Sequence, residues 1–141
     1  MGSRSDATYP AGRTFSDRDG VVHPVGLTSN VILTAVDRTL TADESGSVVV
    51  CTGDDKTITL PATEAGLVYV IVVGATSTST GLSVSPAAAD QIIGNGFTPA
   101  DDKDAINTQA TEVIGDSVTL VGDGASGWYV VNVGGTWARE A

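Results

Sequence analysis

The sequence predicts an all-β protein: a compact antiparallel β-sandwich or small barrel with an extended N-terminal arm. From Asn30 onward, short runs rich in valine, isoleucine and threonine alternate with clusters of glycine, aspartate and serine, which is the pattern of strands and turns. No window of eleven or more residues holds an amphipathic helical series free of glycine and proline. The regular spacing of the runs favours a sandwich or barrel.

Eight strands are expected, near 31–35, 47–51, 57–60, 67–73, 81–84, 112–114, 117–121 and 128–133. The run 57–60 alternates polar and apolar residues, so one of its faces meets water. The run 67–73 is apolar throughout, which is typical of a central strand or one covered on both faces. The glycine-rich loop Gly122–Gly127 joins the last two runs, and this is the strongest hairpin signal in the chain. Helix is limited to single turns near 86–90 or 99–105.

The chain divides into an arm, residues 1–28, and a β-domain, residues 29–141. The arm contains prolines and glycines, has neither a helical nor a strand period, and its three arginines balance its three aspartates. Such a segment cannot bury itself, so we expect a neighbouring chain to hold it. Its expected contact residues are Tyr9, Arg13, Phe15 and Arg18.

The charge balance excludes several kinds of partner. The chain has 141 residues, 17 of them acidic and 7 basic, for a net charge of −10. This argues against nucleic acid, whose phosphates are bound by lysine and arginine, and against anionic membrane surfaces. The longest apolar run, Leu67–Val73, is far below the roughly 18 residues of a membrane span. We expect no membrane partner and no export signal.

Few residues suit catalysis or metal binding. The chain has one cysteine and one histidine, too few for a disulfide or a Cys/His zinc site. His23 lies in the arm, which is a poor scaffold for a general base, and Cys51 at a strand end is expected to be a small buried apolar residue. The loop Gly122–Gly127 lacks the lysine and helix of a phosphate loop. We therefore expect no enzyme activity and no cofactor.

Four acidic clusters leave an alternative open. They are Asp43 with Glu44, Asp54 with Asp55, Asp101 and Asp102 with Asp104, and Asp116 with Asp123. Carboxylates beside glycines usually cap turns. Calcium binding and glycoside hydrolysis use the same side chains, but the spacing lacks the alternating ligands of an EF-hand loop. Solvated turn residues are the preferred interpretation, and calcium remains the alternative.

Three aromatic residues near the C-terminus point to an interface. Trp128 and Tyr129 are adjacent on one strand, so one faces the core and the other faces outward. Trp137 follows two glycines, where a large apolar ring needs a surface to cover it. We expect Trp128, Tyr129 and Trp137 to serve the core or a subunit interface, although exposed aromatics also bind sugars.

A series of short motifs carries a resemblance over about residues 38–133. In order they read TLTADESGSVV from Thr39, ITLP from Ile58, GLVY from Gly66, ADQIIG from Ala89, GDSVTL from Gly115 and GWYV from Gly127. Each is ordinary β-turn sequence, but the series resembles the capsid decoration, or cement, proteins of tailed double-stranded DNA phages and related phage-fibre β-modules. The resemblance implies a non-catalytic β-rich homotrimer on the outer surface of an icosahedral shell of major capsid protein. It does not cover residues 1–28.

Two functions follow as expectations. In the first, the protein is made in the host cytoplasm and stabilises a phage head by binding the assembled lattice of major capsid protein. In the second, it is a tail-fibre or adhesin module that binds a host glycan. The free-standing chain with an arm and no long stalk favours the first.

Overall fold

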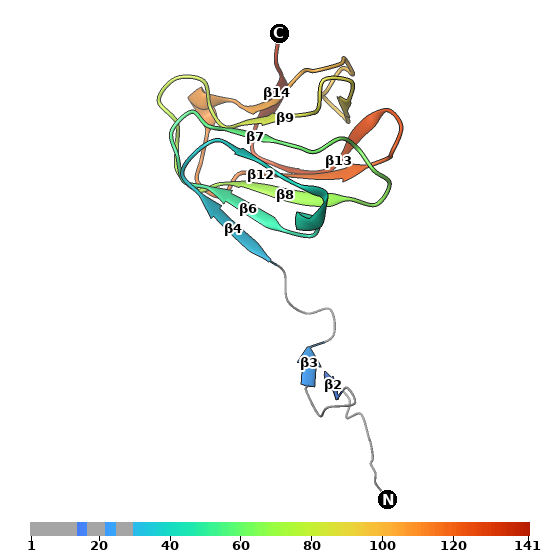
Figure 1. The fold of residues 1–141 in the computed structure, drawn as a ribbon. Coiled ribbons are helices and arrows are strands. Elements are labelled where there is room, and N and C mark those ends of the chain that lie inside the picture. The colour runs from blue at the N-terminus through green and yellow to red at the C-terminus, as the bar shows by residue number, and fades with distance from the viewer. Residues whose placement is uncertain (1–13, 17–21, 25–29) are drawn as a thin grey trace, which may run out of the picture.

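The fold is a sandwich of two β-sheets, as the sequence predicts. The computed structural model describes residues 14–16, 22–24 and 30–141, and Figure 1 shows two layers of strands stacked face to face. One sheet has the strand order β10-β13-β12-β8-β6-β4, and the other has the order β14-β11-β9-β7-β5. The strands of the body are β4 (Val31–Thr34), β5 (Arg38–Thr39), β6 (Val48–Cys51), β7 (Thr57–Thr59), β8 (Val68–Val73), β9 (Ser83–Ser85), β10 (Gln91–Ile93), β11 (Ala105–Asn107), β12 (Ser117–Gly122), β13 (Gly127–Gly134) and β14 (Trp137–Arg139).

The sheets are mixed, which corrects the expectation of an antiparallel sandwich. From β4 to β12 each successive strand lies in the opposite sheet. A chain that winds between two layers re-enters each layer in the same direction, so β4, β6 and β8 pair in parallel, as do β5, β7 and β9. Antiparallel pairing is found between β8 and β12, between β12 and β13, and along β9, β11 and β14.

The predicted hairpin is confirmed. Strands β12 and β13 pair antiparallel across the loop that follows Gly122, with a register shift at Thr119 and Leu120. The Asp123 carboxylate accepts hydrogen bonds from the N–H groups of Ala125, Ser126 and Gly127. These bonds close the loop, and they lower the pKa of Asp123, with the Gly127 N–H as the largest cause.

One predicted strand is wrong, and four observed strands were not predicted. Residues 112–114 follow a short 3-10 turn, η2 (Gln109–Thr111), and form no strand, and Val113 and Ile114 are exposed. Their β-branched side chains favour a strand locally, but the chain is turning there into β12. The strands at 38–39, 91–93, 105–107 and 137–139 were not expected, because two or three residues are too few to show a period.

The core lies between the sheets, and its described buried apolar residues run from Leu40 to Trp137. Tyr69 on β8 and Trp128 on β13 are both fully buried, and their ring centroids are 5.6 Å apart. The other buried apolar residues are Leu40, Val49, Cys51, Ile58, Leu60, Ile71, Val73, Leu82, Val84, Ile92, Phe97, Ala105, Val118, Leu120 and Trp137. Every one of these described core residues belongs to the predicted β-domain.

The arm contains two short strands that the sequence did not predict. Strand β2 (Thr14–Ser16) pairs antiparallel with β3 (Val22–Pro24), so that Phe15 lies opposite His23. Only three residues pair on each side, and the segment has no alternating pattern that would have indicated them. Tyr9, Arg13 and Arg18 lie outside the described residues.

Candidate functional site

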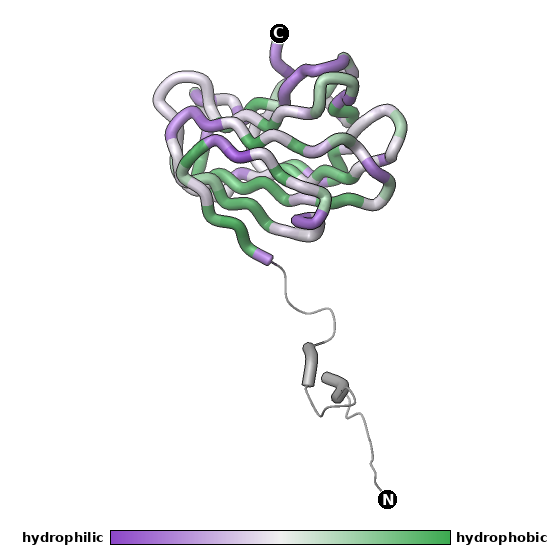
Figure 2. Tube along the Cα trace, viewed as in Figure 1, coloured by the Kyte–Doolittle hydropathy of each residue, from purple (hydrophilic) through white to green (hydrophobic). Residues whose placement is uncertain are grey.

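The outer face of the six-stranded sheet is apolar and uncharged. Along β4, β6 and β8, alternate residues enter the core while the residues between them point away from it. We call the outward apolar set the valine face. It consists of Val31, Leu33, Val48, Val50, Val68, Val70, Val72, Val121 and Tyr129. Figure 2 shows this layer as hydrophobic along β4, β6 and β8.

The register aligns these side chains in rows across the sheet. Val31 lies opposite Val48, which lies opposite Val70. Leu33, Val50 and Val72 form the next row in the same way. A third row joins Val68, Val121 and Tyr129. Such rows of β-branched side chains are the usual content of a sheet face that packs against another layer.

The second sheet packs only on the opposite side of this layer. Figure 1 shows the five-stranded sheet above the six-stranded one, and within residues 30–141 no strand lies beneath it. The consequence is large exposed apolar side chains: Leu33 is 71% exposed and Val31 is 61% exposed. The uninterrupted apolar run 67–73 predicted a strand that is central or covered on both faces, and β8 is central, between β12 and β6. The second sheet covers one of its two faces.

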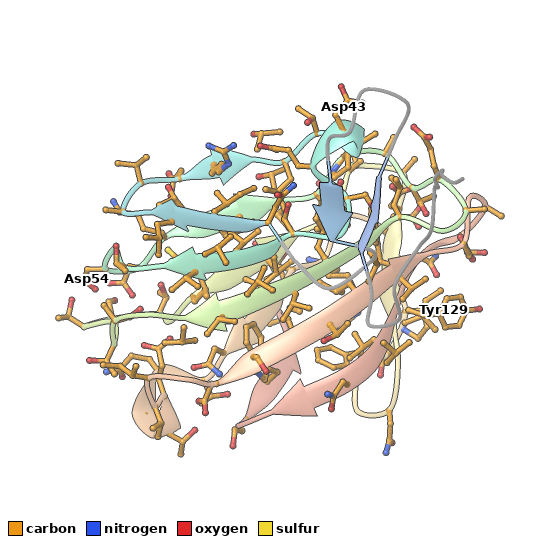
Figure 3. The ribbon with its side chains drawn as sticks, turned by 90° about the horizontal axis from the view of Figure 1, so that it is seen from below. Asp43, Asp54 and Tyr129 are labelled. Atoms are coloured by element: carbon orange, nitrogen blue, oxygen red, sulfur yellow. The ribbon has the colours of Figure 1, made fainter. Side chains whose placement is uncertain are left out.

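Charged groups lie around the valine face and not on it. No outward side chain on β4, β6, β8, β12 or β13 is charged, and the positions beside the valines hold Ser117, Thr119 and Asn132. Viewed from below in Figure 3, Asp43 and Asp54 lie towards opposite ends of the strands, and Tyr129 lies near one margin. The face is therefore a neutral surface on a strongly acidic body.

The three aromatic residues have different environments. Trp128 has no exposed surface and Trp137 is 8% exposed, and the Trp137 Nε1 donates a hydrogen bond to the Gly134 carbonyl at 3.0 Å. The body itself supplies the cover that these two rings need. Tyr129 is 46% exposed and points away from Trp128, as the alternation of a strand requires. Of these three residues, only Tyr129 is exposed.

Asp54 and Asp55 hold a loop of their own chain. Asp55 Oδ1 accepts hydrogen bonds from the N–H groups of Ser79, Thr80 and Gly81, at 3.3, 2.7 and 3.0 Å. Asp54 accepts two from Thr78. The N–H groups of Gly81 and Thr80 are the largest causes that lower the pKa of Asp55 to about 2. This cluster acts as a structural clip, as expected of turn carboxylates.

Carboxylates of the remaining acidic clusters also accept hydrogen bonds from groups of their own chain. Asp101 accepts a hydrogen bond from Gln91 and Asp104 accepts one from Ser83. Asp116 accepts bonds from the Asn107 side chain and the Val113 N–H. Glu44 caps the 3-10 turn η1 (Ala42–Glu44), and the Thr41 N–H is the largest cause of its lowered pKa.

Chemically reactive groups are not gathered at any described position. Among residues 14–16, 22–24 and 30–141, no three His, Cys, Asp or Glu side chains are placed to hold a metal ion together. Cys51 lies in the core, where burial raises the pKa of its thiol. His23 lies on β3, and its side chain is outside the described part of the chain. No helix among the described residues is both long and apolar enough to cross a membrane.

Sequence reasoning missed two features. Glu112 is a buried carboxylate that accepts hydrogen bonds from the N–H groups of Ser77 and Leu82. Nothing in its local sequence marks it, because its partners lie 30 or more residues away. The valine face was also missed as a unit, although the outward valines of β6 and β8 lie within runs that were recognised as strands.

The Asp55 clip predicts a specific dependence on pH. Replacing Asp55 with asparagine should lower the melting temperature at pH 7, because a neutral amide is a weaker acceptor for three N–H groups. The folded pKa of about 2 lies below the value of about 3.9 for an unfolded chain. The contribution of the Asp55 carboxylate to stability is therefore fully present above the unfolded pKa, and it is lost as the pH falls towards 2.

Thermal melts of the wild type and Asp55→Asn at a series of pH values test this. The difference in melting temperature between the two proteins should narrow from about pH 4 downward. Asp102→Asn is a matched control, since Asp102 also has a positive φ, of 57° against 52°, and its carboxylate makes no hydrogen bond with described residues. A difference that stays constant down to pH 2 would contradict the prediction.

Comparisons with protein-family models and with curated proteins find no match to this chain.

Proposed function

We propose that this protein is a non-catalytic structural protein of a phage virion, located on the outer surface of the head. It binds the assembled lattice of major capsid protein as a homotrimer and stabilises that lattice. The observation that carries this proposal is the valine face: a neutral apolar sheet surface, exposed on an acidic body. Exposed apolar surface of this kind is typical of proteins that work in assemblies.

Three further points support the proposal. The order of short motifs from Thr39 to Val130 resembles that of decoration proteins. The described acidic clusters are largely engaged in holding the body's own loops, which is consistent with a structural role. The arm is neutral overall, so its arginines can pair with shell carboxylates that would repel the body.

Within this proposal the arm is the contact to the shell. Tyr9 and Phe15 supply aromatic anchors, the type of residue that often dominates binding energy. Arg13 and Arg18 supply charge-assisted hydrogen bonds to carboxylates. Fixing a chain segment in one conformation costs entropy, so these anchors need well-buried positions on the shell.

The glycan-binding alternative has less support. It relies on an exposed aromatic ring, and Tyr129 is such a ring. However, the residues in its row are Ile93, Val121 and Val68, and their side chains offer no groups to bond sugar hydroxyls. Saturable binding of a host glycan by the purified protein would favour this alternative.

Binding to phage heads tests the proposed function. The full chain is added to heads that lack it, the heads are sedimented, and bound copies are counted. We expect saturable binding and heads that withstand higher temperature, because a ligand at a hundred times its dissociation constant adds about 2.7 kcal/mol per site. Heads that bind no protein, or that gain no heat resistance on binding, would contradict the proposal.

A chain without residues 1–28 tests the arm. We expect the body to stay folded, because the described buried apolar residues form one cluster between Leu40 and Trp137, and circular dichroism and a melting curve check this. We expect its affinity for heads to fall at least tenfold. Unchanged binding by the folded truncation would remove the arm from the mechanism while leaving the decoration role in place.

A further inference from the structure

We infer that the valine face is the surface by which copies of this chain bind one another, with a second copy as its occupant. The inference deepens the proposed function, since it assigns the contact surface of the proposed homotrimer. In that assembly three copies turn their valine faces towards a common axis. The Leu33 side of one face then meets the Tyr129 side of the next.

The size of the face suits a contact between two folded bodies. Its nine residues stand in three rows of three, which corresponds to roughly 300 Å² at the usual strand spacing and rise. A standard interface buries about 800 Å² on each partner, of which a little over half is apolar. The valine face therefore supplies about two-thirds of the apolar part of one such interface, and surface at its border would supply the rest.

The distribution of charge favours a copy of this chain over a basic partner. A basic partner would gain most by docking on the acidic surface of the body, where opposite charges attract. Two copies of a chain with net charge −10 repel wherever their acidic surfaces meet. The neutral valine face is where two such bodies approach with the least repulsion.

The most exposed residues lie at the two lateral borders of the face. Leu33 is on β4, an edge strand of the six-stranded sheet, and is 71% exposed. Tyr129 is on β13, four strands across the same sheet, beside Ile93 on the other edge strand β10, and is 46% exposed. In a closed ring each face touches two neighbours, one at each border, so both borders are covered by a heterologous contact. A tyrosine at such a border is a typical interface anchor.

Sedimentation of the full chain is the first test. We expect three copies per particle at micromolar concentration. Leu33→Lys should weaken association at least tenfold, because it places a charge in the contact. Ile114→Lys is the matched control: Ile114 is 64% exposed but lies in the loop before β12, outside the valine face. Equal association of both variants would overturn the inference.

Disulfide trapping tests the orientation. In a Cys51→Ala background, a chain with both Leu33→Cys and Tyr129→Cys should form covalent trimers on mild oxidation, seen on a non-reducing denaturing gel. The control pairs Tyr129→Cys with Ala138→Cys, which is exposed on β14 of the other sheet, and should stay unlinked. Covalent dimers alone would overturn the ring arrangement, and absence of any cross-link from a trimeric protein would overturn the assigned surface.

Other occupants give different results. The arm is one such occupant. If the wild type is a monomer, and Val70→Cys is labelled by maleimide only after residues 1–28 are deleted, then the arm covers the valine face and the inference is wrong. A monomer that still decorates heads would refute the inference and leave the proposed function standing. A trimer joined through the valine face that binds no heads would refute the proposed function alone.

Discussion

Replacing Trp128 with alanine is expected to lower the free energy of unfolding by about 3–5 kcal/mol, as for other large aromatic residues removed from cores. Trp128 has no exposed surface and packs with Tyr69 at the centre of the sandwich. The cost combines lost apolar burial with a cavity that strands on both sides of the ring cannot collapse to fill. Since whole domains are stable by only about 5–15 kcal/mol, this single change can unfold a large fraction of the protein at 37 °C.

Urea unfolding followed by circular dichroism measures this loss, and two variants serve as controls. Trp128→Phe should cost clearly less, since it keeps most of the apolar volume and removes an indole N–H that is buried without a hydrogen-bond partner. Ile114→Ala changes an exposed residue in the loop before β12, outside the valine face, and should leave the unfolding almost unchanged. Equal losses for Trp128→Ala and Ile114→Ala would contradict the assigned core.

Replacing Gly81 with alanine is expected to cost about 3 kcal/mol, the sum of backbone strain and overpacking. Gly81 has a φ of +99°, and a Cβ atom there would lie 1.9 Å from the Asn107 carbonyl oxygen. That oxygen belongs to the backbone of β11, so it cannot move aside as a flexible side chain would. The same residue donates its N–H to Asp55, so the substitution also disturbs the loop clip.

Gly96→Ala separates strain from crowding. Gly96 has a similar φ of +89°, but a Cβ atom there meets no other atom within 4 Å. It should therefore cost only the backbone term of about 1–2 kcal/mol. The excess loss in Gly81→Ala, measured by the same urea experiment, reports the close approach of the 78–82 loop to β11. No excess would mean that this approach does not exist in solution.

The candidate site could be predicted only in part. The alternation rule assigned Trp128 and Tyr129 to opposite faces, and the structure confirms both directions. The sequence also marked 67–73 as a strand with apolar residues on both sides. It did not show that Val31, Val48 and Val70 form one row, because strands separated by about twenty residues must first be aligned in a sheet. Register is a property of pairing, which no single strand contains.

Local patterns were sufficient where the interacting residues are close in sequence. The all-β class follows from β-branched runs and turn residues, and the β12–β13 hairpin follows from two strands flanking a short glycine-rich loop. The net charge and the lack of a long apolar run also follow from composition alone. None of these conclusions requires knowledge of which residues meet across the molecule.

Contacts between distant segments decided the rest. Whether a strand joins one sheet or the other depends on how the chain winds between the layers, and this winding makes β4, β6 and β8 parallel neighbours. Strands of two or three residues, such as β5 and β11, form because adjacent strands supply their hydrogen bonds. The exposure of the valine face has the same origin. A strand with apolar residues on both sides can turn either side towards the second sheet, so the packing of that sheet determines which side is left open.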